Sequence, residues 1–172
     1  MAQTKPEGRW PAVDLNRYRF SGNWRLGARR ERVYAVLREP DDYARWWPQI
    51  RLIRRVDEES GELVARSFLP YDLFITATRG VEDAEAGTLQ ANLGGDLEGW
   101  FRWTVRADGR GTRVDFDQDV VVRRPLLRRL SPLARPVLVA NHTWMMRGGR
   151  RGLARHLAGR ESGCGPQTPP GQ

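Results

Sequence analysis

Large apolar side chains alternate with polar ones along residues 17–26. Tyr18, Phe20 and Trp24 fall on one side of an extended chain, and arginine or another polar residue holds most positions between them. A period of two with large apolar residues on one face is typical of a half-buried strand. The sequence therefore predicts an opening β-strand that ends at Gly27.

Two short helices are predicted next. The first covers residues 28–37, where the apolar positions form a stripe at helical spacing. The second begins at Pro40, because proline suits the first turn of a helix, and it ends at Pro48. It has an aromatic face made of Tyr43, Trp46 and Trp47.

A run of short apolar segments separated by turn residues follows the helices. These segments predict six further strands, at residues 50–56, 63–69, 73–79, 88–93, 97–106 and 112–122. The links between them are tight turns or short loops, such as residues 108–111. Short links join antiparallel neighbours, so we expect an antiparallel meander.

The pattern becomes helical after Pro125. We expect one long helix that starts between Pro132 and Pro136 and reaches Leu157. It is amphipathic, with four arginines largely on the side opposite the apolar face: Arg147, Arg150, Arg151 and Arg155. Three glycines would let another backbone approach it closely: Gly148, Gly149 and Gly152.

These elements predict an α+β fold in which a seven-stranded antiparallel sheet wraps around the long C-terminal helix. A twisted sheet curls, and one helix about 10–12 Å wide does not fill its concave side. We therefore expect an internal cavity between sheet and helix. The predicted domain covers residues 17–158, between a loose arm at 1–16 and a disordered tail at 159–172.

Length and composition fit a single soluble domain. The chain has 172 residues, 40% hydrophobic and 29% charged, and no apolar run reaches the roughly 20 residues of a membrane span. The start of the chain lacks an apolar signal core, so we expect a cytoplasmic protein. Cys164 is the only cysteine and the two histidines are fourteen residues apart, so neither a metal site nor a cofactor is expected.

The net charge is +8, and Lys5 is the only lysine among 29 basic residues. A basic balance raises the question of nucleic acid or anionic membranes as partners. The arginines are scattered along the chain, which disfavours nucleic acid and is typical of solvated surface. Peripheral contact with an anionic membrane stays open, as does the oligomeric state.

The chain resembles the START-like helix-grip superfamily (SRPBCC), and within it the polyketide cyclase/dehydrase-like proteins. The resemblance extends from about Tyr18 to Leu157, and its most specific segment is the Tyr-x-x-Trp-Trp-Pro run at 43–48. The other matching segments are residues 24–26, 32–37, 95–99, 111–113 and 141–146. The resemblance implies a pocket for a hydrophobic ligand, and it fixes no chemistry, because one fold hosts many functions.

The predicted cavity lining combines large apolar side chains with a few polar ones. The candidate ligand-binding residues are Trp47, Phe68, Tyr71, Phe101, Trp103, Phe116, Gln118, His142, Met145 and Met146. Ordinary core packing is the competing interpretation for the aromatic and methionine side chains. The candidate catalytic residues are Arg66, Tyr71 and His142. The resemblance to aromatase/cyclases implies arginine and tyrosine in the pocket, and a neutral imidazole inside a cavity can act as an acid or a base. For Arg66, surface solvation is the favoured alternative.

Three functions therefore remain as hypotheses. The first is a module that binds a lipid, an isoprenoid quinone or a polyketide-like molecule in the cavity. The second is a cyclase or dehydratase that uses the same cavity. The third is a basic surface that contacts anionic lipid or nucleic acid. The arginines of the last helix would form this surface.

Overall fold

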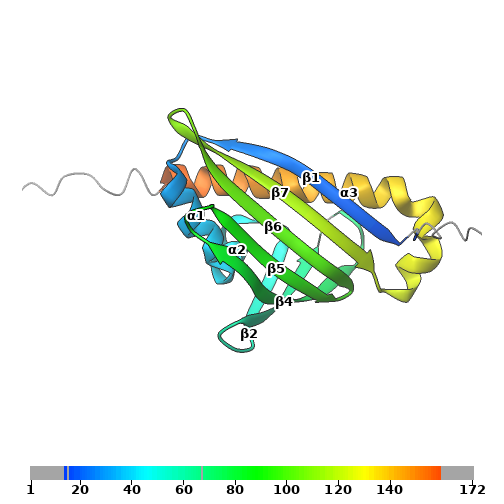
Figure 1. The fold of residues 1–172 in the computed structure, drawn as a ribbon. Coiled ribbons are helices and arrows are strands. Elements are labelled where there is room, and N and C mark those ends of the chain that lie inside the picture. Colours follow the sequence, from blue (N-terminus) through cyan, green and yellow to red (C-terminus); the bar gives the residue numbers. More distant parts are fainter. Residues whose placement is uncertain (1–13, 15, 67, 160–172) are drawn as a thin grey trace, which may run out of the picture.

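The computed structural model describes residues 14, 16–66 and 68–159. Seven strands and a long C-terminal helix form the body of the molecule (Figure 1). The strands are β1 (Arg17–Leu26), β2 (Ile50–Arg55), β3 (Ser60–Arg66), β4 (Asp72–Asp83), β5 (Thr88–Gly95), β6 (Leu97–Asp108) and β7 (Gly111–Val122). The helices are α1 (Arg30–Arg38), the 3-10 turn η1 (Pro40–Asp42), α2 (Tyr43–Trp46) and α3 (Pro125–Gly159).

All seven strands belong to one antiparallel sheet in the order β1-β7-β6-β5-β4-β3-β2. Six strands follow one another as a meander, and β1 adds to the far edge beside β7. The sheet curls around α3, as Figure 1 shows. This is the predicted α+β helix-grip architecture, with its short helices directly after the first strand. The predicted arm lies almost entirely outside the described residues, and so does the predicted tail.

Several element boundaries differ from the prediction, among them those of β3 and α3. Strand β3 begins at Ser60 and ends at Arg66, three residues earlier than expected, because the Asp57 carboxylate accepts hydrogen bonds from the Glu59 and Ser60 amides and closes the turn sooner. Its far end is set by pairing, since Arg66 is the partner of Asp72 on β4.

Helix α3 starts at Pro125, earlier than the expected start between Pro132 and Pro136. Pro125 occupies the first helical position, where its missing amide hydrogen costs nothing. The two later prolines lie inside the helix, and each removes one backbone hydrogen bond. Figure 1 shows the first turns of α3 at an angle to the rest, as expected for a proline-containing helix.

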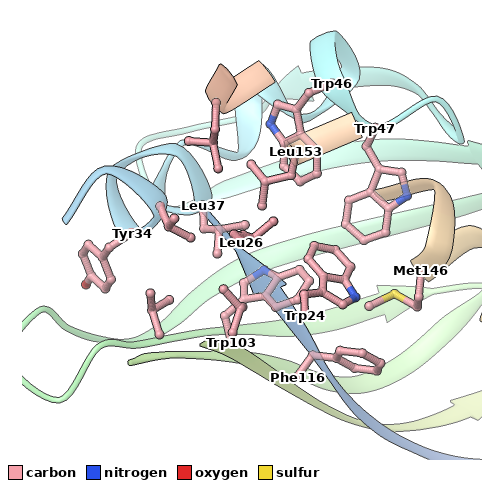
Figure 2. Packing of buried hydrophobic residues seen from close by; sticks show 14 of the residues in the cluster. Trp24, Leu26, Tyr34, Leu37, Trp46, Trp47, Trp103, Phe116, Met146 and Leu153 are labelled. Atoms are coloured by element: carbon pink, nitrogen blue, oxygen red, sulfur yellow. The ribbon is translucent and has the colours of Figure 1, made fainter. Parts of the chain in front are cut away.

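The largest core cluster lies where α1 and α2 meet α3 at one end of the sheet. Figure 2 shows tryptophans from three elements facing one another: Trp24 of β1, Trp103 of β6, and Trp47 directly after α2. The ring centroids of Trp24 and Trp103 are 4.8 Å apart. Leu153 of α3 is fully buried in the same cluster. These side chains form the main core of the molecule.

The glycines of α3 allow this close packing, as the sequence predicted. A Cβ atom on Gly152 would overlap the carbonyl oxygen of Trp46, and one on Gly149 would lie 2.7 Å from the Trp47 ring. A Cβ atom on Gly148 would overlap the Gln49 amide. Any larger residue here would push α3 away from α2.

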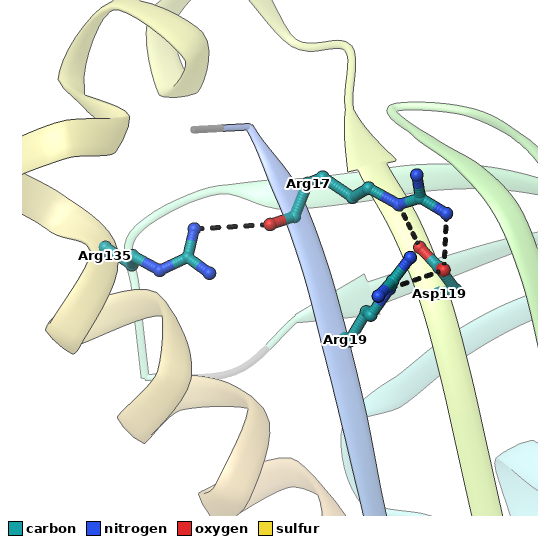
Figure 3. Close-up of polar contacts among 4 residues, drawn as sticks. All are labelled: Arg17, Arg19, Asp119 and Arg135. Atoms are coloured by element: carbon teal, nitrogen blue, oxygen red, sulfur yellow. Dashed lines mark hydrogen bonds and ion pairs between the residues drawn. The ribbon is translucent and has the colours of Figure 1, made fainter. Parts of the chain in front are cut away.

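The outer face of the sheet is polar and carries ion pairs. Asp119 of β7 accepts hydrogen bonds from Arg17 at 2.6 and 2.7 Å and from Arg19 at 2.9 Å (Figure 3). In the same view, Arg135 of α3 donates to the main-chain oxygen of Arg17. The start of β1 is thus joined both to β7 and to α3.

Candidate ligand cavity

A cavity of about 320 Å³ lies between the concave face of the sheet and α3. The strand register decides which side chains reach it, because alternate residues face inward. Phe20, Gln118 and Phe101 face inward from three adjacent strands, and Gln118 is opposite both of the others in the register. From α3, the lining includes Leu138, Asn141, His142, Met145 and Met146.

A histidine and a glutamine form the polar centre of the cavity wall. Nε2 of His142 is 3.0 Å from Oε1 of Gln118, which is buried. The imidazole stacks on Phe20, with ring centroids 3.7 Å apart and planes 7° apart. Burial lowers the pKa of His142 to about 4, so the ring is neutral at physiological pH. Because Oε1 only accepts, Nε2 carries the proton in this arrangement and Nδ1 keeps its lone pair.

Asn141 adds a third polar side chain to the same wall. It is buried, and its Nδ2 donates to the sulfur of Met145 at 3.8 Å. Its Oδ1 has no hydrogen-bond partner among the described residues. A buried carbonyl oxygen without a donor is unfavourable, so this atom carries an energetic cost in the wall.

Tyr43 closes the wall on the side of the short helices. Its hydroxyl donates to the carbonyl oxygen of Leu37 at 2.6 Å and accepts from Nε1 of Trp103 at 3.2 Å. Burial raises the pKa of Tyr43, so the phenol stays protonated. Both polar contacts are internal, and Tyr43 therefore fixes the wall in place.

Tyr71 lines the cavity and packs against the same hydrophobic cluster as Leu138 of α3. The guanidinium of Arg124 lies 5.4 Å from the centre of its ring. Burial raises the pKa of Tyr71, and the nearby charge of Arg124 opposes that rise. Arg124 is held in turn by the main-chain oxygen of Asp72 and by Asp96. Tyr71 is thus a positioned phenol at the wall.

Charged side chains line the part of the cavity that lies between α1, η1 and the neighbouring strands. Arg38 pairs with Glu82 at 2.5 Å, and Arg55 pairs with Asp41 at 2.5 Å. These pairs join the short helices to β4 and β2. The inner wall is apolar with neutral polar groups, and charge is confined to this rim.

Most of the sequence-predicted ligand-binding residues lie at the cavity. Those in the lining are Trp47, Tyr71, Phe101, Trp103, Gln118, His142, Met145 and Met146. Phe116 is buried outside the lining, because its ring fills the space above Gly22. Phe68 lies after the end of β3, is 51% exposed and contacts Trp144 outside the cavity.

Of the candidate catalytic residues, Arg66 lies away from the cavity. Its Nε is 2.6 Å from Asp72, and both side chains are partly exposed. This corresponds to the surface alternative. Tyr71 and His142 both line the cavity but at different places in the wall, since Tyr71 packs with the cluster around Tyr18 and Val120.

Several lining residues were not among the predicted ligand-binding residues, and Phe20, Tyr43 and Asn141 are the most notable of them. Phe20 and Tyr43 were assigned only to a buried strand face and an aromatic helix face. Those patterns contained the signal, since an apolar face is normally buried. Asn141 had a weaker signal, its position next to His142 on the inner side of the helix.

Neither a metal site nor a membrane span is found in the part of the chain that the structure describes. Within residues 14, 16–66 and 68–159, no three His, Cys, Asp or Glu side chains come together as metal ligands would. None of the described helices combines the length and apolar character that crossing a bilayer requires.

The chain was compared with known proteins by sequence and by structure. No family model matches the sequence, and no curated protein matches it. Solved structures do match. The Zhui aromatase/cyclase from Streptomyces sp. R1128 has a TM-score of 0.72 at 15% identity, covering 84% of this chain and 96% of that one.

Two further structures have the same architecture. A START superfamily protein from Mycobacterium smegmatis has a TM-score of 0.60 at 14% identity, covering 83% of this chain and 98% of that one. The di-domain aromatase/cyclase BexL of the BE-7585A biosynthetic pathway has a TM-score of 0.63 at 14% identity, covering 83% of this chain and 50% of that one. The chain therefore has the START-like helix-grip fold seen in polyketide aromatase/cyclases.

Proposed function

We propose that this protein binds a hydrophobic or amphipathic small molecule in the cavity between the sheet and α3. The supporting observation is the cavity itself, about 320 Å³ in volume with a largely apolar inner wall. Small-molecule sites commonly measure about 300–1,000 Å³ and combine apolar walls with a few polar groups. Here those groups are His142, Gln118 and Asn141.

The chemistry of the wall favours a neutral ligand with aromatic or isoprenoid character. Phe20, Phe101 and Trp103 offer ring faces and edges, and Met145 adapts to irregular apolar shapes. No charge faces the ligand at the His142 wall, since the ring is neutral and its partner is an amide. Lipids, isoprenoid quinones and aromatic polyketides are therefore the classes to test.

A cavity-filling variant tests this proposal. Ala91 lines the cavity from β5, so Ala91→Phe should occupy part of the space. Asn92 is exposed on the outer face of the same strand, and Asn92→Phe is the matched control. Native mass spectrometry of protein from its own host should detect a bound small molecule in the wild type and the control and less in Ala91→Phe.

Lipids, isoprenoid quinones or aromatic polyketides that bind should also raise the unfolding temperature of the wild type and of Asn92→Phe more than that of Ala91→Phe. Binding raises the unfolding temperature only if the folded state binds the ligand. If Ala91→Phe keeps full protection and the same bound molecule, the cavity is not the binding site. If no class protects the wild type and nothing copurifies, the binding function is rejected.

Catalysis on a polyketide-like chain in the same cavity is a second candidate. It is supported by the likeness to the Zhui aromatase/cyclase and by two proton-transfer groups in the wall, the neutral His142 ring and the Tyr71 phenol. His142→Gln and Tyr71→Phe should change the products formed from a poly-β-ketone while thermal protection remains. Arg66→Gln, outside the cavity, is the control. Unchanged products in both cavity variants would reject catalysis by these residues.

A further inference from the structure

Helix α3 presents an apolar and basic stripe on the side turned away from the cavity. Val137, Trp144 and Arg151 are seven residues apart, which places them on one line of the helix surface. Arg155 and Arg147 lie beside this line. We call these five residues, together with Phe68, the Trp144 stripe.

The apolar part of the stripe is unusually exposed for its size. Trp144 is 46% exposed and Phe68 is 51% exposed, and their rings meet edge to face with centroids 6.0 Å apart. Val137 lies about two helical turns before Trp144 and is 45% exposed. Large aromatic residues gathered on a surface mark an interaction site more often than solvated surface.

The charge of the stripe is positive and is not neutralised nearby. Helix α3 contains seven arginines and neither aspartate nor glutamate. Arg147, Arg151 and Arg155 are exposed, and none of them forms an ion pair with a described residue. The arginines of the sheet differ, since Arg17 and Arg19 share Asp119. The unpaired positive charge is thus concentrated next to the exposed tryptophan.

We propose that the Trp144 stripe docks this protein on an anionic lipid bilayer. Basic residues are attracted to acidic headgroups, and tryptophan and phenylalanine insert at the boundary between headgroups and acyl chains. A helix that lies along the surface presents both kinds of residue at once. The exposed aromatic pair favours a bilayer over nucleic acid, whose phosphates would need only the arginines. Docking does not require an occupied cavity.

The test is co-sedimentation of the protein with vesicles at low and high salt. The wild type should bind vesicles of phosphatidylcholine with phosphatidylserine and should bind pure phosphatidylcholine far more weakly. The double variant Arg147→Gln/Arg151→Gln should bind about 30-fold more weakly, and Trp144→Ser about tenfold more weakly. The matched control is Arg29→Gln/Arg110→Gln, which removes two exposed arginines without an ion pair among the described residues. It should bind almost as the wild type does.

Insertion of Trp144 has its own readout. Phosphatidylcholine brominated in its acyl chains should quench the fluorescence of the wild type more than that of Trp144→Phe. Equal binding to charged and neutral vesicles, equal loss in the control and the stripe variant, or no Trp144-dependent quenching would each overturn the proposal. Stronger stripe-dependent binding to duplex DNA than to vesicles would assign the surface to nucleic acid and reject the bilayer.

Discussion

The imidazole of His142 lies almost parallel to the ring of Phe20, with 3.7 Å between ring centroids. Its Nε2 reaches Gln118 at 3.0 Å, and the remaining surroundings are largely apolar. This environment can hold a neutral ring but disfavours a charged one, which is why burial lowers the pKa of His142 to about 4.

We therefore expect acid to destabilise the protein through His142. The pKa of an unperturbed histidine is 6.5, so the unfolded chain gains a proton below that pH while the folded ring stays neutral until about pH 4. The stability contributed by the neutral ring is complete above pH 6.5 and is lost as the pH falls toward 4. Between pH 7.5 and 5 the loss is about 2 kcal/mol.

Urea unfolding of the wild type and His142→Gln at a series of pH values measures this effect. The free energy of unfolding of the wild type should fall more steeply with acidification, so its difference from the variant should change by about 2 kcal/mol between pH 7.5 and 5. Parallel curves for the two proteins over this range would contradict a buried, neutral His142.

The ion pairs of Asp119 on the outer face should matter much less. Hydrogen bonding to Arg17 lowers the pKa of Asp119, but the side chains of Arg17 and Arg19 are 49% and 72% exposed. Solvent screens such pairs, so Asp119→Asn should destabilise only slightly, and added salt should reduce the effect. Asp117→Asn is the control, since Asp117 lies on the same strand face without an ion pair among the described residues. Thermal unfolding of both variants at low and high salt measures the effect. A large decrease in the unfolding temperature of Asp119→Asn that does not depend on salt would show that the ion pairs are not screened.

Gly152 should be the least replaceable glycine of α3. A Cβ atom there would overlap the carbonyl oxygen of Trp46, and main-chain atoms cannot move aside cheaply. We expect Gly152→Ala to lower the free energy of unfolding by about 3 kcal/mol. Gly159→Ala adds the same methyl group at the end of the helix, where nothing lies within 4 Å, and should be neutral or slightly stabilising. Chemical denaturation of both variants tests this, and equal stabilities would show that α2 and α3 are not closely packed.

The fold was predictable because both kinds of periodicity persist along the sequence. Alternation in residues 17–26 and 112–122 gave the strand faces, and their observed register pairs Phe20 with Gln118 as two inward residues. The start of α3 was missed because prolines were taken as boundaries. Pro132 and Pro136 instead lie within the helix. Whether a helix continues through a proline depends on tertiary packing, which the local sequence does not show.

The cavity lining was harder to predict than the fold. Alternation shows that Phe116 faces inward, but not whether an inward ring borders empty space or fills it. That depends on Gly22 of the neighbouring strand, since a Cβ atom there would lie 2.6 Å from the Phe116 ring. Phe68 was misplaced for another reason, because β3 ends at Arg66, the partner of Asp72 on β4, and Phe68 lies beyond it.

Tyr43 and Tyr34 differ in whether the phenolic hydroxyl group forms hydrogen bonds. The Tyr43 hydroxyl donates to Leu37 and accepts from Trp103, whereas the Tyr34 hydroxyl is buried without a hydrogen-bond partner among the described residues. Burial raises the pKa of both phenols, so both are protonated at neutral pH.

Removing the two hydroxyl groups should therefore have opposite consequences. Tyr43→Phe leaves the Leu37 carbonyl and the indole of Trp103 without their partner, so we expect a loss of about 2 kcal/mol in the free energy of unfolding. Tyr34→Phe removes only an unpaired polar atom and should be neutral or stabilising by up to about 1 kcal/mol. Urea denaturation measures both. Since each substitution deletes one phenolic hydroxyl group, equal effects would mean that the hydrogen bonds of Tyr43 do not stabilise the cavity wall.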